Sequence, residues 1–247
     1  MNTDTLSDLR QLWQAAFGDS DAQLDCFFGT AFHPERCHYI EKNGKPVSAL
    51  HWFPCSLDGR PVAYLYAIAT DVAYRGQGLC RQLLIQTHQI LNGQGYAGAI
   101  LVPAEPGLFD LYRKFGYRVC CTCREFSRDA GDQSTQLKML NAAEYATLRA
   151  KYLPQGGVLQ EGVTLHYLEQ QASFYEGEGF VFAATVQDNI LTCHELLGDP
   201  SAAEGIVRAL RCSQGHFRAP GTGRDFAMFL PLVEDCPTPR WFGLALD

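Results

Sequence analysis

The sequence lacks any run of about 18 consecutive apolar residues, the minimum length for a membrane-spanning helix. Its first ten residues also lack the basic and then apolar pattern of a secretory signal peptide. We therefore expect a cytoplasmic protein with no membrane partner. The formal net charge of −7 supplies no broad attraction to phosphate backbones, so we expect no nucleic-acid partner. An acidic surface instead favours a cationic substrate such as an amine.

The sequence also lacks the paired ligand spacing of a zinc site. In the reducing compartment that we expect, its ten cysteines would rarely form disulfides. The one tight cluster comprises Cys120, Cys121 and Cys123, and no second pair follows at a defined distance. We predict no metal, and we interpret these three residues as small apolar side chains on a strand.

The chain is long enough for one large domain or two smaller ones, with 247 residues of which 47% are hydrophobic. The spacing of apolar residues predicts helices in six segments: 6–17, 22–30, 79–91, 107–115, 142–151 and 201–212. Strand patterns cover nine others: 37–41, 46–54, 61–72, 97–103, 117–125, 179–185, 190–197, 215–219 and 225–232. The alternation in the first half predicts an α/β fold with a mixed central sheet, flanked by helices and parallel in its middle. The apolar tail from Trp241 to Leu246 is a further strand candidate.

The most informative stretch is Ile68–Arg81, where a strand ends, a glycine-rich turn follows and a helix begins. Gly76 and Gly78 allow close approach of a ligand, and free N–H groups at the helix start favour an anion. No Lys-Ser or Lys-Thr occurs in the chain, which excludes the NTPase phosphate loop. Arg81 stands where the dinucleotide fingerprint requires its third glycine. Apart from phosphate binding, the remaining alternative is a turn that only joins strand to helix.

This turn resembles motif A of the GNAT acetyltransferases, Arg/Gln-x-x-Gly-x-Gly/Ala. Arg75-Gly-Gln-Gly78-Leu-Cys80 matches it at Arg75 and Gly78, with Cys80 in the last small position. The resemblance implies acetyl-CoA as co-substrate. It also implies that the strand end offers its backbone to the pantetheine arm and that the turn binds the pyrophosphate. The implied cofactor-binding residues are Ile68, Ala69, Thr70, Arg75, Gly76, Gln77, Gly78, Leu79, Cys80 and Arg81.

A second match lies downstream, where Tyr112-Arg-Lys-Phe-Gly-Tyr117 resembles the Tyr-x-x-x-Gly-Phe/Tyr signature of the same family. The resemblance places Tyr112 beside the sulfur of coenzyme A. A phenol of pKa about 10 is an adequate acid for a departing thiolate. Tyr112 is thus the candidate general acid, and the alternative is a tyrosine that only packs on an amphipathic helix.

In some members of the family the general base is a glutamate on the strand that corresponds to residues 97–102. This strand carries no glutamate here. Glu105 is either a contact for the substrate amine or a solvated loop carboxylate. The chain as a whole resembles the Eis-type branch of GNAT proteins, which implies two parts. Residues 1–130 would be the GNAT acetyl-CoA-binding catalytic domain, and residues 135–247 a smaller, degenerate GNAT-like domain. In that branch the terminal carboxylate enters the active site, so Asp247 is the candidate base or substrate contact, unless it is a frayed terminus.

The resulting hypothesis is an acetyl-CoA-dependent N-acetyltransferase that acts on a small-molecule amine by direct attack. One alternative is an acyltransferase that acts on a protein amine or carries another acyl group. The other is a sensor that binds acyl-CoA without turnover. The resemblance places the acceptor pocket between the helices at Arg10 to Phe28 and loops of the second half. The sequence gives neither the acceptor nor the oligomeric state.

Overall fold

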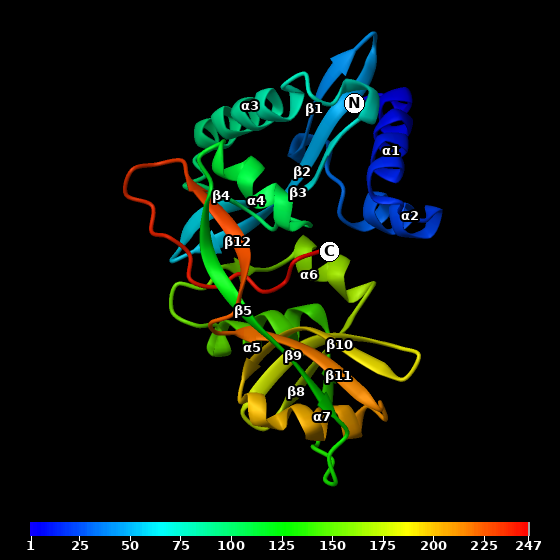
Figure 1. Ribbon diagram of the computed structural model, residues 1–247, viewed down its shortest axis with the longest axis vertical. Coiled ribbons are helices and arrows are strands. Elements are labelled where there is room, and N and C mark those ends of the chain that lie inside the picture. The colour runs from blue at the N-terminus through cyan, green and yellow to red at the C-terminus, as the bar shows by residue number, and fades with distance from the viewer. Residues whose placement is uncertain (247) are drawn as a thin grey trace.

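A computed structural model describes residues 1–246 as a mixed α/β protein, and Figure 1 shows its helices arranged around a long sheet. The helices are α1 (Thr3–Phe17), α2 (Asp21–Thr30), α3 (Leu79–Gly93), α4 (Pro106–Arg113), α5 (Ala142–Tyr152), α6 (Val163–Glu169) and α7 (Ala203–Ala209). Short 3-10 turns are η1 (Pro34–Arg36), η2 (Val72–Tyr74) and η3 (Pro200–Ala202). The predicted fold class, a mixed central sheet flanked by helices, is confirmed.

The sheet has a continuous order, β1-β2-β3-β4-β12-β5-β11-β10-β9-β8-β6, and β7 pairs with β2. In the first half the strands are β1 (Cys37–Lys42), β2 (Lys45–Leu57), β3 (Arg60–Thr70), β4 (Gly98–Leu101) and β5 (Arg118–Asp129). In the second half they are β6 (Lys138–Leu140), β7 (Leu159–Gln160), β8 (Ser173–Gly177), β9 (Phe180–Gln187), β10 (Ile190–Gly198), β11 (Gln214–Pro220) and β12 (Arg224–Pro231). The described second half therefore joins the sheet of the first.

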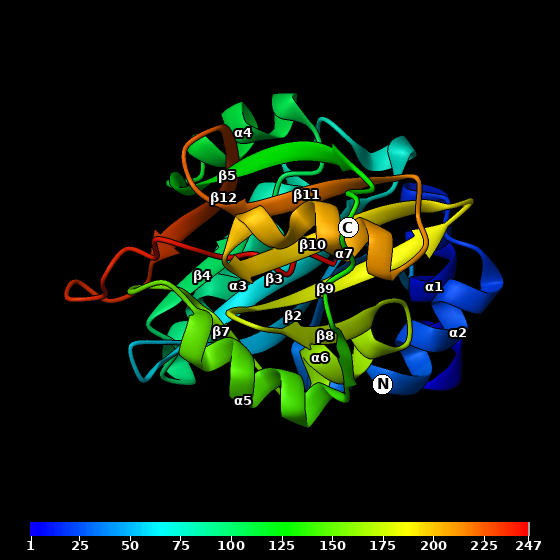
Figure 2. The ribbon, with the colours of Figure 1, turned by 90° about the horizontal axis from the view of Figure 1, so that it is seen from below.

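Three buried clusters fill the layers. Cluster 1 joins α1, α2, α5 and α6 to one side of the sheet, and cluster 2 joins α3 and α4 to the other side of β2–β4. Cluster 3 lies under α7. Figure 2 shows α5 and α7 on opposite sides of the strands of the second half, as expected because alternate β9 side chains enter clusters 1 and 3. Each of these helices and strands buries one face, which explains the spacing of the apolar residues in the sequence.

The second half repeats the order of the first. Three antiparallel strands β8, β9 and β10 are followed by α7 and then by β11, which is parallel to β10. The strands β1, β2 and β3, helix α3 and parallel β4 have the same arrangement. The domain boundary between residues 130 and 135 remains a prediction. Strands from both halves alternate in one sheet, since β12 of the second half lies between β4 and β5 of the first.

Several sequence expectations were wrong in detail. The parallel middle is limited to β3–β4 and β10–β11, because β12 lies between β4 and β5 and is antiparallel to both. The tail at 241–246 forms no strand, only one bridge between Trp241 and Gly157. The helix expected at 201–212 is shorter, because η3 precedes it and Arg211 has a positive φ of 57°. Strand β3 ends at Thr70, and Val72 begins η2.

Candidate active site

Strands β3 and β4 pair briefly and then separate. Their parallel pairing covers only Val62↔Gly98, Ala63↔Ala99 and Tyr64↔Ile100. Beyond this point β3 continues to Thr70, whereas β4 ends at Leu101. The edge of β3 that faces β4 is therefore free of sheet pairing from Leu65 onward, and a strand edge of this kind can pair with an extended, amide-bearing ligand. It lies at the carboxyl ends of two parallel strands, where α/β sheets bind ligands.

A bulge shapes the same part of β3. The register with β2 shifts between Ala49↔Ala69 and His51↔Tyr66. Ala67 has a positive φ of 52°, which costs a residue with a Cβ atom on the order of 1–3 kcal/mol. The indole N–H of Trp13 donates to the Ala67 carbonyl oxygen at 2.8 Å and so ties the bulge to α1. No local pattern predicts this bulge, because alanine carries no turn signal.

The glycine turn leads from η2 into α3. Gly76 and Gly78 both have φ of 77°, and a Cβ atom on either would meet no atom within 4 Å. Gly78 is the N-cap of α3 and provides no side-chain cap, so the first N–H groups of the helix stay available for an anion. A groove of 420 Å³ lies there, lined by Gly78, Arg81, Gln82, Ile85 and Gln86. The open space and the free donors fit a pyrophosphate.

The predicted cofactor residues lie together. Ile68, Ala69 and Thr70 form the end of β3, and Leu79, Cys80 and Arg81 form the first turn of α3. Arg75 connects the two, since its Nε donates to the Thr70 carbonyl oxygen at 3.1 Å. Gln77 is exposed between the two glycines. A separate groove of 490 Å³ lies between α1, the β1–β2 turn and residues 70–75.

Tyr112 lies in the same region as Cys80. It is the seventh residue of α4, is 6% exposed and packs in cluster 2 with Leu79. Burial, with a smaller contribution from Cys80, raises the pKa of the Tyr112 hydroxyl. Burial also raises the pKa of Cys80 to about 11. At neutral pH Tyr112 is therefore protonated, which is the form required of an acid.

The C-terminal tail runs to the base of the strand divergence. Its backbone bonds to segment 156–160, where the Val158 N–H donates to the Trp241 carbonyl at 2.8 Å. The Gln160 side chain bonds both the N–H and the carbonyl of Leu244. The last described residue, Leu246, donates its N–H to the Tyr64 hydroxyl at 3.2 Å. Asp247, the predicted base, lies outside the described residues.

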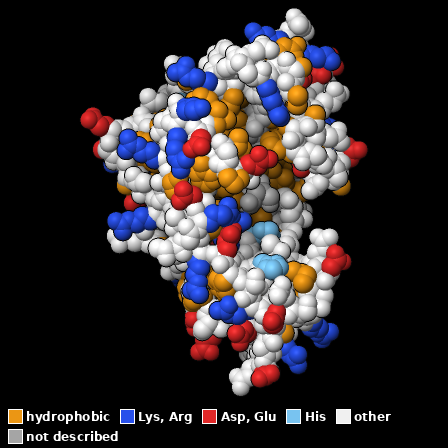
Figure 3. Space-filling model, in the orientation of Figure 1, with side chains coloured by type: hydrophobic (Ala, Val, Ile, Leu, Met, Phe, Trp, Pro, Cys, Tyr) orange, Lys and Arg blue, Asp and Glu red, His pale blue; other side chains and the backbone are white. Residues whose placement is uncertain are grey.

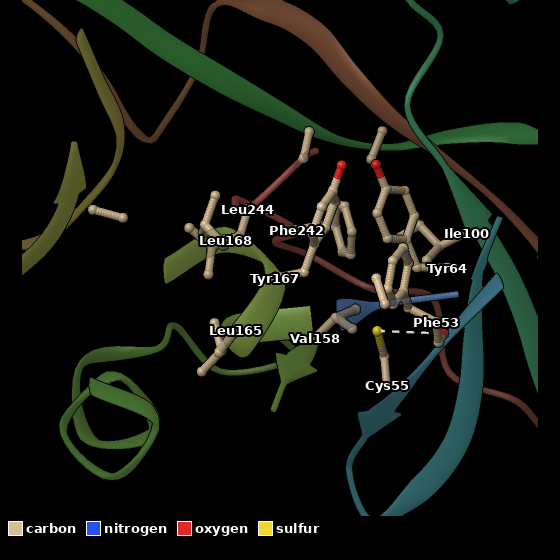
Figure 4. Packing of buried hydrophobic residues seen from close by; sticks show 14 of the residues in the cluster. Phe53, Cys55, Tyr64, Ile100, Val158, Leu165, Tyr167, Leu168, Phe242 and Leu244 are labelled. Atoms are coloured by element: carbon tan, nitrogen blue, oxygen red, sulfur yellow. Dashed lines mark hydrogen bonds between the residues drawn. The ribbon is translucent and has the colours of Figure 1, made fainter. Parts of the chain in front are cut away.

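Figure 4 shows the tail in the packed interior: Phe242 and Leu244 lie among Tyr64, Tyr167 and Leu168. The Phe242 ring centroid is 4.8 Å from that of Tyr64, which belongs to the last residue pair before β3 and β4 separate. Both tail residues are fully buried. Burial of this apolar tail therefore holds its described part, up to Leu246, against Tyr64 of β3.

A buried charge network anchors the start of the tail. Glu195 on β10 accepts from Arg149 Nε at 2.6 Å and Nη2 at 2.9 Å, and Arg149 lies on α5. The same carboxylate accepts from Trp241 Nε1 at 2.8 Å and from the Tyr145 hydroxyl at 3.3 Å. Arg149 and Glu195 are both 0% exposed. No sequence pattern predicts this network, because its members are up to 96 positions apart and belong to no motif.

The helices expected to form the acceptor pocket contact the second half. Phe27 of α2 packs 5.7 Å from Tyr167 of α6 and 5.6 Å from Tyr66 of β3, measured between ring centroids. Half-buried Asp19 lies in the loop between α1 and α2, and burial raises its pKa. Burial also raises the pKa values of Tyr66 and Tyr167, and the charge of Asp19 raises both further. Figure 3 shows a hollow with hydrophobic side chains between the α3–α4 region and the α1–α2 region.

Glu105 and two histidines of the second half do not converge on this site. Glu105 is exposed at the N-cap of α4 and makes no capping bond. His194 lies 3.3 Å from the Thr185 hydroxyl, and His216 lies 2.8 Å from the Ser127 hydroxyl. Across residues 1–246, no group of three or more His, Cys, Asp or Glu side chains could hold a metal ion. No helix in that range is both long and apolar enough to cross a membrane.

The mixed sheet, its strand divergence and the glycine turn together define an acetyltransferase-like fold, and comparisons with known proteins agree. Residues 1–120 match the model of the acetyltransferase (GNAT) domain family. This part of the chain is therefore a GNAT acetyltransferase domain. A comparison with curated proteins found no significant match.

Solved structures resemble nearly the whole chain at low sequence identity, which shows the shared fold. A GCN5-related N-acetyltransferase from Kribbella flavida is 17% identical with a TM-score of 0.69, covering 93% of this chain and 69% of its own. Eis1 from Mycobacterium abscessus is 14% identical with a TM-score of 0.68, covering 94% and 72%. A tandem GNAT protein from the clavulanic acid biosynthesis pathway is 11% identical with a TM-score of 0.56, covering 95% and 97%.

Proposed function

We propose that this chain is an acetyl-CoA-dependent N-acetyltransferase that transfers the acetyl group directly to the amine of a small molecule. The observation that carries the proposal is the convergence of three features at one place. These are the free edge of β3, the uncapped start of α3 and the buried Tyr112. Acyl transfer from a thioester needs a site for each of the pantetheine arm, the pyrophosphate and the departing sulfur.

In the proposed reaction a neutral amine attacks the acetyl carbonyl, and the bond from carbon to sulfur breaks. The bulged edge of β3 offers backbone N–H groups that can stabilise the oxyanion. Tyr112 donates its proton to the departing thiolate. In this proposal the amine proton passes to the terminal carboxylate of Asp247, the residue that follows Leu246 in sequence. Asp19 and the aromatic rings of Tyr66 and Tyr167 favour an acceptor that arrives as a cation, which releases one proton to solvent before it attacks as the neutral amine.

Two measurements separate this proposal from its alternatives. Acetyl-CoA should raise the melting temperature, because a ligand that binds only the folded state stabilises it. Thiol release with a panel of small amines should then exceed release without an amine. Stabilisation without thiol release would favour the sensor, and release only with peptide amines would favour a protein acceptor. No stabilisation by any acyl-CoA would overturn the proposal.

Replacing Gly78 should remove acetyl-CoA binding. In Gly78→Val the new side chain projects into the open space before α3. We expect the dissociation constant for acetyl-CoA, measured by calorimetry, to rise at least tenfold. Gly59→Val is a matched control, because Gly59 has φ of 78° and equally open surroundings in the β2–β3 turn. Both variants carry similar backbone strain. Equal affinities in the two would remove the turn from the cofactor site.

Removing the last three residues should abolish turnover but spare acetyl-CoA binding. The truncation takes away the Leu246 contact to Tyr64 and both carboxylates of Asp247, moves the chain terminus back to Leu244, and leaves the turn before α3 intact. Thiol release and calorimetry on the same preparation check both halves of the expectation. Asp247→Asn keeps the α-carboxylate and so distinguishes it from the side chain. Retained turnover in the truncated chain would exclude Asp247 as the base.

A further inference from the structure

Strand β5 departs from regular alternation at two adjacent cysteines. Its register with β12 runs from Cys121↔Ala227 to Val119↔Met228, so Cys120 is an extra residue on β5. A bulge of this kind re-aims the side chains around it. Val119 packs in cluster 2, whereas Cys120 and Cys121 both pack in cluster 1. In an unbulged strand, neighbouring side chains would point to opposite faces.

The two thiols are in contact as a result. The side chains of Cys120 and Cys121 share a hydrogen bond, and the Cys120 thiol also lies 3.4 Å from the Ala227 carbonyl oxygen. Cys121 is 5% exposed, and Cys120 is half-buried. A small reagent can therefore reach the pair from the side of Cys120.

The surroundings favour a thiolate on one of the two sulfurs. The hydrogen bond from Cys120 lowers the pKa of Cys121 against the opposing effect of burial, and backbone groups of Ala227 and Phe242 lower it further. The same hydrogen bond, together with burial, raises the pKa of Cys120. Thiolate is the reactive form of cysteine. Cys55 lacks such a partner, and burial raises its pKa to about 12.

We propose that Cys120 and Cys121 form a reversible modification site that closes to a disulfide when it reacts with a hydroperoxide. The Cys121 sulfur attacks a peroxide oxygen and becomes a sulfenic acid, and the O–O bond breaks with release of water or an alcohol. The Cys120 sulfur then attacks the sulfenic sulfur, an S–S bond forms, and the S–O bond breaks with release of water. The two thiols lose two hydrogens in all, and the peroxide is reduced. A thiol reductant restores the pair.

Peptide mapping of the full-length protein tests this site without reference to acetyl transfer. The native protein is treated with hydrogen peroxide, denatured, alkylated with N-ethylmaleimide and digested with trypsin. Cleavage after Arg118 and Arg124 gives a peptide that carries Cys120, Cys121 and Cys123. We expect one alkylated thiol and a loss of two hydrogens in the wild type, reversed by dithiothreitol. In Cys123→Ser we expect the same loss with no alkylated thiol.

Three variants assign the bond. Cys120→Ser and Cys121→Ser should each abolish the loss of two hydrogens, and Cys123→Ser should retain it. A loss that persists in Cys120→Ser would assign the bond to Cys121 and Cys123 and overturn the proposal. Three alkylated thiols in the oxidised wild type would also overturn it, whether or not the variants fold. Peptides with Cys55 or Cys193 serve as internal controls and should stay fully alkylated.

Discussion

Replacing Tyr112 with phenylalanine should lower kcat by about 100-fold or more, since a positioned general acid contributes on the order of 10²–10⁴ in rate. The substitution removes only the hydroxyl and keeps the ring in cluster 2, so the fold should persist. Acetyl-CoA affinity should change little, because the turn before α3 is untouched. Steady-state thiol release and calorimetry on the same variant give both quantities.

Tyr117→Phe is the matched control for that experiment. The Tyr117 ring lies 5.9 Å from that of Tyr112, and its hydroxyl is 2.7 Å from His88 Nε2. Removal of this hydrogen bond should cost about 1 kcal/mol of stability and leave kcat within a few-fold. If both variants lose activity equally, the loss reflects packing in cluster 2. If Tyr112→Phe retains full kcat, another group protonates the thiolate.

Replacing Glu195 with alanine should lower the free energy of unfolding by about 3–5 kcal/mol, because Arg149 would stay buried without its partner. The same change removes the acceptor for the indole N–H of Trp241 and so loosens the start of the tail. Denaturant unfolding measures the loss. We also expect lower turnover with nearly unchanged acetyl-CoA affinity, because the network holds the tail and does not contact the turn before α3.

Asp235→Ala provides the comparison for Glu195. Arg60 and Asp235 form an ion pair of 2.8 Å, but their side chains are 41% and 74% exposed. Loss of such a surface pair should cost less than about 1 kcal/mol. Replacing the buried pair together, as in Arg149→Met with Glu195→Leu, should recover much of the stability lost in Glu195→Ala. A Glu195→Ala variant as stable as Asp235→Ala would show that the buried network is not an anchor.

Local patterns predicted the parts of the site that are contiguous in sequence. The turn from Arg75 to Arg81 and the helix that carries Tyr112 follow from glycine positions, periodicity and the resemblance to GNAT motifs. Their neighbours in space were not predicted. Neither the bulge at Ala67 nor its bond to Trp13 has a local signal, because the interaction links residues 54 positions apart. Helix α6 was missed because its seven residues give too short a pattern.

The sheet order shows the same limit. The sequence predicted β12 as a strand but placed β4 and β5 in a parallel middle, because adjacent elements along the chain usually pair in space. Strand β12 lies between them instead. The tail was expected as a strand because its residues are apolar. In the structure they are buried by side-chain packing and by bonds to Gln160, without a ladder.

The position of β12 sets the order in which the protein can be completed during synthesis. Residues 224–231 supply the strand between β4 and β5, yet they leave the ribosome more than 90 residues after β5 ends. Until then the GNAT domain has two unpaired inner strand edges, which invite wrong pairing. The contacts that close the sheet span over 100 positions, so their formation should be slow. Nascent chains that end before Arg224 should therefore depend on chaperones far more than the finished protein does.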